Sequence, residues 1–456
     1  MKFEKAVEEF FKAPAVALGE GVEAAKSLEG EFLSKTPLHA AEEYLNTLGP
    51  GLTTGAADDD PSGIATYSQA GAQYGFQLLW LALFTFPLMS VAQEMCARIG
   101  LVTGKGLAAN IRTHYPRWAL YGATGLLFFA NTLNLGADLG AMAKAAQLMI
   151  PGLDFTFALM AFAITILLLQ IYTTYARYAK YLKYLTLVLF SYVATALLIP
   201  IDWHQVLMST IVPSITFSSE QILLICAILG TTISPYLFFW QTSQEVEEQV
   251  LKGYTTVSAR KHEVTQDEIS RMRTDTWSGM FFSNAIMFFI IAACAATLAA
   301  NGITDIKTAD EAALALRPFA GEWAFFLFAL GIIGTGLLAV PILAGSASYA
   351  ISESFGWRTG LYRKLNEAYA FYGVIIVAML LGIGFNFVGI DPMKALIYSA
   401  IANGLIAPVV LYFIVSVSSD KKIMGHFTNN ALTRWIGWAT VAVMGVVGAA
   451  AIVVLL

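Results

Sequence analysis

The stretch PGLTTGAADDDPSGIATYSQAGAQYG, residues 50–75, decides the fold. Both ends consist of small and apolar residues that suit a membrane helix, whereas the middle holds three consecutive acids, Asp58, Asp59 and Asp60. Pro61 lacks a backbone N–H and disfavours helical backbone at the residue before it. We therefore expect a membrane helix that unwinds beside three carboxylates.

Such a break indicates a binding site. Unwound backbone at membrane depth is tolerated only where it is buried in protein or lines a wet cavity, and acids there are read as functional by default. Ser62 and the permissive Gly63 prolong the irregular stretch. We interpret Asp60 as a cation ligand, with Asp58 and Asp59 as vestibule or outer-shell acids. The alternatives are that Asp60 caps the half-helix that follows and that the other two bond to unwound backbone.

The composition excludes an ordinary soluble enzyme. Of 456 residues, 57% are hydrophobic and 13% charged, and the mean hydropathy is +0.64. Apolar runs of about 18 residues or more can each cross a bilayer. We expect an all-α membrane protein with eleven spans, at about 50–74 (broken), 76–100, 118–149, 154–173, 178–201, 221–245 (broken), 276–300, 321–350, 367–387, 393–416 and 434–456.

Charge sets the expected orientation. With a cytoplasmic N-terminus, all but four of the 27 Lys and Arg fall in the cytoplasmic tail, the cytoplasmic loops or the flanking span ends, as the positive-inside rule requires. Eleven spans then place the C-terminus outside the cytoplasm, and a bacterial inner membrane suits the chain. We expect residues 1–48 to form a cytoplasmic amphipathic extension. The connection 246–275 should be a solvated cytoplasmic loop, with Glu245, Glu247 and Glu248 at its rim.

A second interrupted helix follows five spans later. The sixth span, ILLICAILGTTISPYLFFWQTSQEVEE, is broken by Gly230, Ser234 and Pro235. One class of transporter consists of two inverted five-helix halves that each begin with a discontinuous helix, and its ion site lies between the two breaks. The expected organisation is a first inverted repeat over 49–201, a second over 202–418, and an additional helix within 419–456.

The first broken helix resembles that of the Nramp family of divalent-metal transporters. The family's Asp-Pro-Gly-Asn motif stands here as Asp60-Pro61-Ser62-Gly63, and its Gly-Ala-Gln-aromatic-Gly motif as residues 71–75. The resemblance covers essentially the whole membrane portion. It implies a LeuT-type fold with one extra helix and metal transport by alternating access.

In the sixth span, the family's Met-Pro-His motif stands as Ser234-Pro235-Tyr236. The run from Gly230 to Ile233 matches the one that offers a backbone carbonyl to the metal, which assigns the Thr231 carbonyl as a ligand. Asn403, in the tenth span, lies about where the family has a polar residue facing the site; the alternative is an interhelical hydrogen bond.

The departures from the family change the expected cargo. Ser234 replaces a soft methionine sulfur with a hydroxyl, which faces the ion or bonds back to its own helix. Gly63 deletes the asparagine ligand, while Asp58 and Asp59 add carboxylates. A wide site without sulfur suits Mg²⁺, which keeps its waters and prefers oxygen ligands. The pattern is similar to that of the divergent Nramp-related magnesium transporters. Mn²⁺ accepts the same ligands and stays open.

Proton coupling is expected to be lost. The family's third-helix Asp-Leu-x-Glu element stands as Asp138-Leu139-Gly140-Ala141, which keeps the aspartate and loses the glutamate. Tyr236 replaces the histidine, and a phenol with a reference pKa of about 10 does not titrate near neutral pH. We expect uptake driven by membrane potential, with Asp138 and Tyr236 in coupling or gating. Alternatively, Asp138 is a buried group paired with Lys144.

Three other functions compete with this reading. A proton-coupled Mn²⁺ or Fe²⁺ transporter would retain ordinary Nramp chemistry. A sodium-coupled organic-solute symporter shares the fold, but three acids at the break would repel a substrate carboxylate. A membrane enzyme or receptor would need a catalytic metal constellation that the five histidines do not provide. We expect no enzyme, no cofactor and no nucleic-acid partner; the partners are divalent cations and the lipid bilayer, and the sequence does not indicate the oligomeric state.

Overall fold

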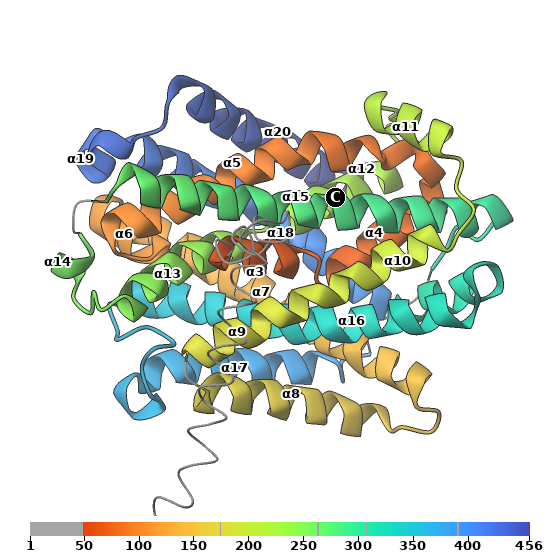
Figure 1. Cartoon of the computed structure of the whole chain (residues 1–456), viewed down its shortest axis with the longest axis horizontal. Helices are drawn as coiled ribbons and strands as arrows, with labels where there is room; N and C mark the ends of the chain where they lie inside the picture. The colour runs from red at the N-terminus through yellow and green to blue at the C-terminus, as the bar shows by residue number, and fades with distance from the viewer. Residues whose placement is uncertain (1–48, 174, 262–263, 307–308, 390–391) are drawn as a thin grey trace, which may run out of the picture. The chain divides into compact units, whose positions relative to one another are not determined.

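The computed structural model describes residues 49–173, 175–261, 264–306, 309–389 and 392–456. The expected extension, residues 1–48, lies outside the described residues. Residues Gly49–Leu456 form one compact unit, and the regular structure of its described part is entirely helical (Figure 1). The principal helices are α3 (Pro50–Asp58), α4 (Pro61–Tyr74), α5 (Trp80–Thr103), α6 (Leu107–His114), α7 (Arg117–Met149), α8 (Phe155–Tyr172), α9 (Tyr175–Leu185), α10 (Phe190–Leu197), α11 (Trp203–Ile211), α12 (Ser219–Thr232), α13 (Pro235–Leu251), α14 (Val257–Arg260), α15 (Gln266–Thr297), α16 (Ala309–Phe355), α17 (Tyr369–Phe385), α18 (Pro392–Ser419), α19 (Lys421–Met424) and α20 (Ala431–Leu455).

Eight helical segments of the described chain are long and apolar enough to cross a membrane. The other three expected spans are also helical, but two of them are divided and one is short. The first is divided into α3 and α4, the fifth into α9, a 3₁₀ turn (Thr186–Leu189) and α10, and α17 has 17 residues. The apolar runs therefore mark helices as expected, while the number of membrane crossings stays a prediction.

The connection between the sixth and seventh spans is shorter than we expected. Helix α13 continues to Leu251, and α15 begins at Gln266. Thr265 and Glu268 form a capping box at the start of α15, where each side chain accepts a hydrogen bond from the other residue's backbone N–H. The expected loop over 246–275 is therefore too long, because its first and last residues belong to α13 and α15. The polar composition of these helix ends had suggested a loop.

The expectation of a solvated acidic rim is also wrong for two of its three members. Glu245 and Glu247 are buried. Glu247 accepts hydrogen bonds from the backbone N–H groups of Leu361 (2.7 Å) and Tyr362 (3.1 Å) and from the hydroxyl of Tyr349. Glu247 thus binds the segment after α16 to α13. The sequence alone does not distinguish such a buried acid from one on the surface.

The two halves of the first span pack against the long helix α15. Helix α15 also contacts α5, while α7 packs against α16, α17 and α18 (Figure 1). Close packing of α3 on α15 requires glycine: a Cβ added at Gly55 would lie 2.2 Å from the carbonyl oxygen of Gly279, and one at Gly279 would lie 2.1 Å from that of Gly51. The helices meet here backbone to backbone, as small residues allow in membranes.

Asp275 of α15 holds the beginning of α3. Its carboxylate accepts hydrogen bonds from the backbone N–H groups of Gly49 (2.7 Å), Gly51 (2.7 Å) and Leu52 (3.1 Å). The first N–H groups of any helix lack partners within the helix. A carboxylate from a neighbouring helix therefore satisfies three of them and fixes α3 on α15.

We expect Gly55→Ala to lower the free energy of unfolding by about 1–3 kcal/mol, because the new methyl group overlaps the α15 backbone. The measurement is the thermal unfolding midpoint of the purified protein in detergent. Gly122→Ala is the matched control, because no atom lies within 4 Å of a Cβ at this position in α7. Equal midpoints for the two variants would contradict the close packing of α3 on α15.

Candidate functional site

The first helix break is shaped by Pro61, the first residue of α4, and by Asp60 at its N-cap. Asp60 has extended backbone, and its Oδ1 accepts hydrogen bonds from the Ser62 hydroxyl (2.6 Å) and the Gly63 N–H (2.7 Å). This is a helix N-cap in which a carboxylate satisfies a free N–H. The capping role that the sequence left open is therefore present.

The second oxygen of Asp60 reaches other helices. Its Oδ2 accepts a hydrogen bond from Asn134 Nδ2 of α7 (2.7 Å) and a long one from the Tyr236 hydroxyl of α13 (3.4 Å). The Asn134 amide oxygen in turn accepts from the Ser399 hydroxyl of α18 (2.6 Å). A carboxylate accepts about four hydrogen bonds. Both oxygens of Asp60 thus accept hydrogen bonds, and its network links α4, α7 and α13 and, through Asn134, α18.

Each break leaves one carbonyl without its helical donor. The donor for the Ala57 carbonyl would be the N–H of residue 61, and the donor for the Thr231 carbonyl that of residue 235, but both positions are proline. The Tyr236 hydroxyl donates to the Ala57 carbonyl (2.7 Å). The Ser234 hydroxyl donates to the Thr231 carbonyl (2.5 Å) and to that of Gly230 (2.8 Å). Ser234 is therefore turned back onto its own helix, the second of the two orientations considered from the sequence.

The two breaks lie next to each other. A Cβ added at Gly63 would meet the Thr231 hydroxyl at 3.0 Å and the Asp58 carbonyl at 3.2 Å. Tyr236, immediately after the second break, bonds to the first. The expected juxtaposition of the residues at the first break with Gly230, Thr231, Ser234 and Pro235 is therefore found.

Several predicted site residues are buried without a hydrogen-bond partner in the described chain. Both carboxyl oxygens of Asp59 and Asp138 and both side-chain polar atoms of Asn403 are in this group, as is one oxygen of Asp58. The other oxygen of Asp58 accepts from the Ser283 hydroxyl (2.7 Å). Burying such groups costs several kcal/mol unless a partner arrives. The carboxyl and amide oxygens among them are acceptors that a cation or its water would satisfy, whereas the Asn403 Nδ2 is a donor.

The alternative partner for Asp138 is not seen. Lys144 lies instead over the ring of Phe155, with its Nζ 5.3 Å from the ring centre. The interhelical hydrogen bond considered for Asn403 is likewise not formed among the described residues. The side-chain polar atoms of Asp138 and Asn403 therefore have no hydrogen-bond partner among the described residues.

Sequence reasoning missed Asn134, Ser283 and Ser399. Asn134 lies one helical turn before Asp138, so the two residues share a face of α7. That spacing was a usable signal for Asn134. The serines carried none, because a serine in a membrane helix most often bonds to its own backbone, as Ser399 also does with Leu396 (2.7 Å).

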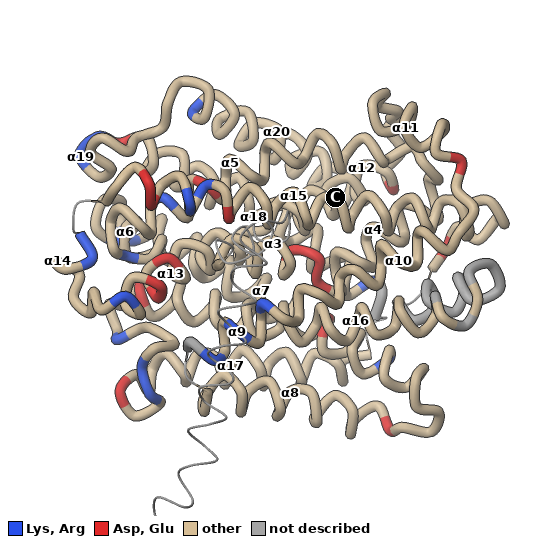
Figure 2. Tube along the Cα trace, viewed as in Figure 1, with Lys and Arg blue, Asp and Glu red and all other residues tan. Residues whose placement is uncertain are grey.

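The donor set around the breaks consists of oxygen and amide groups. Residues 57–63 and 230–236 contain no Cys, Met or His. Figure 2 shows acidic residues at the gap between α3 and α4, deep among uncharged helices. In the described part of the chain, no three His, Cys, Asp or Glu side chains converge closely enough to hold a metal directly. The arrangement suits a cation that keeps water between itself and most of the carboxylates.

Comparison with known proteins places these features in a family. The family model described as "Natural resistance-associated macrophage protein-like" (Nramp) matches residues 51–454. A curated relative, the divalent metal cation transporter MntH of Klebsiella pneumoniae, is 25% identical over 414 residues, covering 89% of this chain and 93% of the relative.

Two solved structures share the fold. The Eremococcus coleocola manganese transporter superposes with a TM-score of 0.69 at 17% identity, over 91% of this chain and 87% of that one. Mhp1, a nucleobase-cation-symport-1 family transporter, superposes with a TM-score of 0.54 at 15% identity, over 89% and 91%. The expected all-α LeuT-type membrane fold is confirmed.

We expect Tyr236→Phe to destabilise the protein by about 1–3 kcal/mol, because it leaves the Ala57 carbonyl buried without a donor. The thermal unfolding midpoint in detergent measures the effect. Tyr369→Phe is the control, because it also removes a tyrosine hydroxyl but from a residue that is 69% exposed. We expect its unfolding midpoint to equal that of the wild type. An unchanged midpoint for Tyr236→Phe would show that the Ala57 carbonyl finds another donor.

Proposed function

Because the match over residues 51–454 shows that this chain belongs to the Nramp family, it is a divalent metal cation transporter, and we propose that its cargo is Mg²⁺, moved largely hydrated into the cytoplasm by alternating access. The family resemblance of the sequence is confirmed. As a family of transporters, Nramp proteins are not enzymes, and the metal is their substrate. The place of this chain on a magnesium-carrying branch is part of the proposal.

One observation carries the proposal: the buried, unpartnered acceptors of Asp59 and Asp138 beside the helix breaks. An anionic carboxylate in such surroundings needs a cation or a strong donor. Hydrated Mg²⁺ offers positive charge and water O–H donors together. Mg²⁺ dehydrates reluctantly and is usually held through one or two carboxylates with several waters retained.

The inner ligands that a dehydrated metal would need are engaged elsewhere. The Ala57 and Thr231 carbonyls already accept from the Tyr236 and Ser234 hydroxyls. Asp60 uses both oxygens in hydrogen bonds. The remaining free acceptors favour contact with the ion's waters, and the absence of sulfur from the two breaks removes the ligand that soft transition metals prefer.

Mn²⁺ is the second candidate. It accepts carboxylate, carbonyl and water ligands as Mg²⁺ does. The solved Eremococcus protein is a manganese transporter, and the curated Klebsiella relative is a divalent metal cation transporter. A Mn²⁺ cargo would require Ser234 or Tyr236 to release its carbonyl, so that the metal could coordinate it directly.

We propose further that uptake follows the membrane potential without proton coupling. Neither break contains a histidine, and the third-helix element ends in Ala141 where the family has an acid. A divalent ion entering a negative interior gains about 4.6 kcal/mol per 100 mV, twice the single-charge value. That gain drives accumulation without a second ion.

Uptake into proteoliposomes tests cargo and coupling together. With Mg²⁺-, Mn²⁺- and pH-sensitive dyes inside, we expect Mg²⁺ entry that rises with an inside-negative potential and leaves internal pH unchanged. Mn²⁺ entry with acidification and exclusion of Mg²⁺ would overturn both parts of the proposal. Failure to transport either metal would overturn the proposed cargo and point to another divalent metal.

Two substitutions at Asp60 separate charge from capping. Asn is as good an N-cap as Asp, whereas Ala costs about 0.5–2 kcal/mol at such a position. We expect both Asp60→Asn and Asp60→Ala to abolish Mg²⁺ uptake, with the unfolding midpoint lowered mainly in the alanine variant. The control Asp305→Asn removes an exposed charge and should transport normally. Normal uptake by Asp60→Asn would show that Asp60 acts only as a cap.

Ser234→Met tests the link between ligand type and selectivity. It frees the Thr231 carbonyl and adds a sulfur, so we expect the ratio of Mn²⁺ to Mg²⁺ uptake to rise about tenfold, equivalent to about 1.4 kcal/mol. Ser234→Ala frees the carbonyl without adding sulfur and isolates the first effect. An unchanged ratio in both variants would remove position 234 from the selectivity argument.

A further inference from the structure

A cavity lined by residues of both polar and apolar type lies away from both helix breaks. Its volume is about 620 Å³, and three segments surround it: the α5–α6 connection with α6, the residues before α15, and α19 with the following 3₁₀ turn, Gly425–Phe427. None of its lining residues belongs to residues 57–63 or 230–236. The cavity is therefore separate from the proposed metal path.

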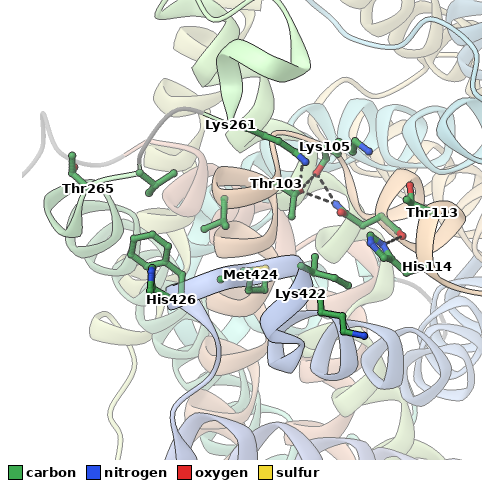
Figure 3. Close-up of a pocket in the computed structure, with 15 residues that line it drawn as sticks. Thr103, Lys105, Thr113, His114, Lys261, Thr265, Lys422, Met424 and His426 are labelled. Carbon is green, nitrogen blue, oxygen red and sulfur yellow. Dashed lines mark hydrogen bonds between the residues drawn. The ribbon is translucent and has the colours of Figure 1, made fainter.

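Lysines from all three segments line this cavity. Figure 3 shows Lys105, Lys261 and Lys422 around it, with Lys261 and Lys422 extending from opposite sides. No Asp or Glu is among the lining residues, and none of the three lysines has an ion-pair partner within the described chain. Burial, followed by the charges of Lys261 and Arg112, lowers the pKa of Lys105. Among the described residues, the cavity wall thus carries three lysines and no acid.

Two acids close in sequence to the lining residues serve as helix caps. Asp420 accepts from the backbone N–H of Lys422 (2.8 Å), and Glu268 accepts from the N–H of Thr265 (3.0 Å). Neither of these two acids lines the cavity.

The rest of the wall supplies further polar side chains and an apolar surface. Two histidines, His114 and His426, and the hydroxyl-bearing Thr113 and Thr265 stand beside the lysines (Figure 3). Apolar side chains complete the lining: Val102, Val264, Ile423, Met424 and Phe427. Small-molecule sites typically have volumes of about 300–1,000 Å³ and combine an apolar lining with a few convergent polar groups.

We propose that this cavity binds an anion carrying two or more phosphate charges. Lysine binds phosphate as a point charge through three rotatable donors, and three lysines match a multiply charged group better than a single carboxylate. Because no carboxylate that could hold Mg²⁺ is among the described lining residues, the metal-free polyphosphate should bind more tightly than its Mg²⁺ complex. The same chemistry is offered by a free polyphosphate compound and by a phosphorylated lipid headgroup.

The position of the cavity suits both a free phosphate compound and a lipid headgroup. It lies at the end of the helices where Lys and Arg gather, around α6, α14 and α19 (Figure 2). The positive-inside rule predicts that this end faces the cytoplasm. A ligand there would join three segments that are far apart in the sequence, and a ligand that binds only the folded state raises its stability. The proposal does not depend on which metal is transported.

Pyrophosphate is the probe for free phosphate. Isothermal titration of the full-length protein in neutral phosphatidylcholine nanodiscs, without Mg²⁺, should give saturable binding and a rise in the unfolding midpoint. We expect the double variant Lys261→Gln/Lys422→Gln to weaken binding about tenfold or more. The matched control, Lys252→Gln/Lys421→Gln, removes two exposed lysines that do not line the cavity and should bind as the wild type does.

Nanodiscs containing cardiolipin, an anionic lipid with two phosphates, test the lipid source. A rise in the unfolding midpoint relative to neutral nanodiscs, present in the control pair and absent in Lys261→Gln/Lys422→Gln, would assign the site to a lipid headgroup. Binding of pyrophosphate in neutral nanodiscs would assign it to a free phosphate compound. If neither probe acts, or if both lysine pairs respond alike, the proposal is overturned. Metal uptake by the cavity variants should remain at the wild-type level.

Discussion

The structure depends on how two carbonyl groups are satisfied at membrane depth. Proline at residues 61 and 235 removes the N–H that would have bonded to the Ala57 and Thr231 carbonyls. In lipid, such groups must find partners inside the protein. Tyr236 and Ser234 supply those partners, and both belong to the second break. The second break therefore supplies the donors for both carbonyls, and the bond from Tyr236 to Ala57 places the two discontinuous helices in contact.

The acids at the first break divide into two kinds. Asp60 is held by Ser62, Gly63 and Asn134, so its charge is stabilised and its position is fixed. Asp59 and Asp138 are as deeply buried but have no such partners. A carboxylate surrounded by donors organises the local fold, whereas one without donors is set up to gain a partner. In the proposed transport, the second kind would meet the cation, while Asp60, to which the sequence pointed first, would hold the break in place.

The sequence predicted those features that follow from local rules. Apolar runs located the helices, and each Asp-Pro or Ser-Pro pair located a break, because proline acts on its immediate neighbours. It did not predict pairings that depend on which helices meet. Asn134, Ser283 and Ser399 became site residues only through contacts more than 70 residues away in the chain. Glu247 was misread for the same reason, since its partners lie on the segment after α16.

The packing of α3 limits how any opening of the site can occur. At its beginning, three N–H groups bond to Asp275, and along its length Gly55 meets the backbone of Gly279. At its end, the Ala57 carbonyl bonds to Tyr236. Backbone contacts between glycines lose little side-chain surface when they separate. The bonds to Asp275 and from Tyr236 are different, because both join buried groups that would need new partners. Under the proposed transport of a hydrated cation, water that enters with the ion would supply the donor that the Ala57 carbonyl needs, so that release of α3 and arrival of the ion would stabilise each other.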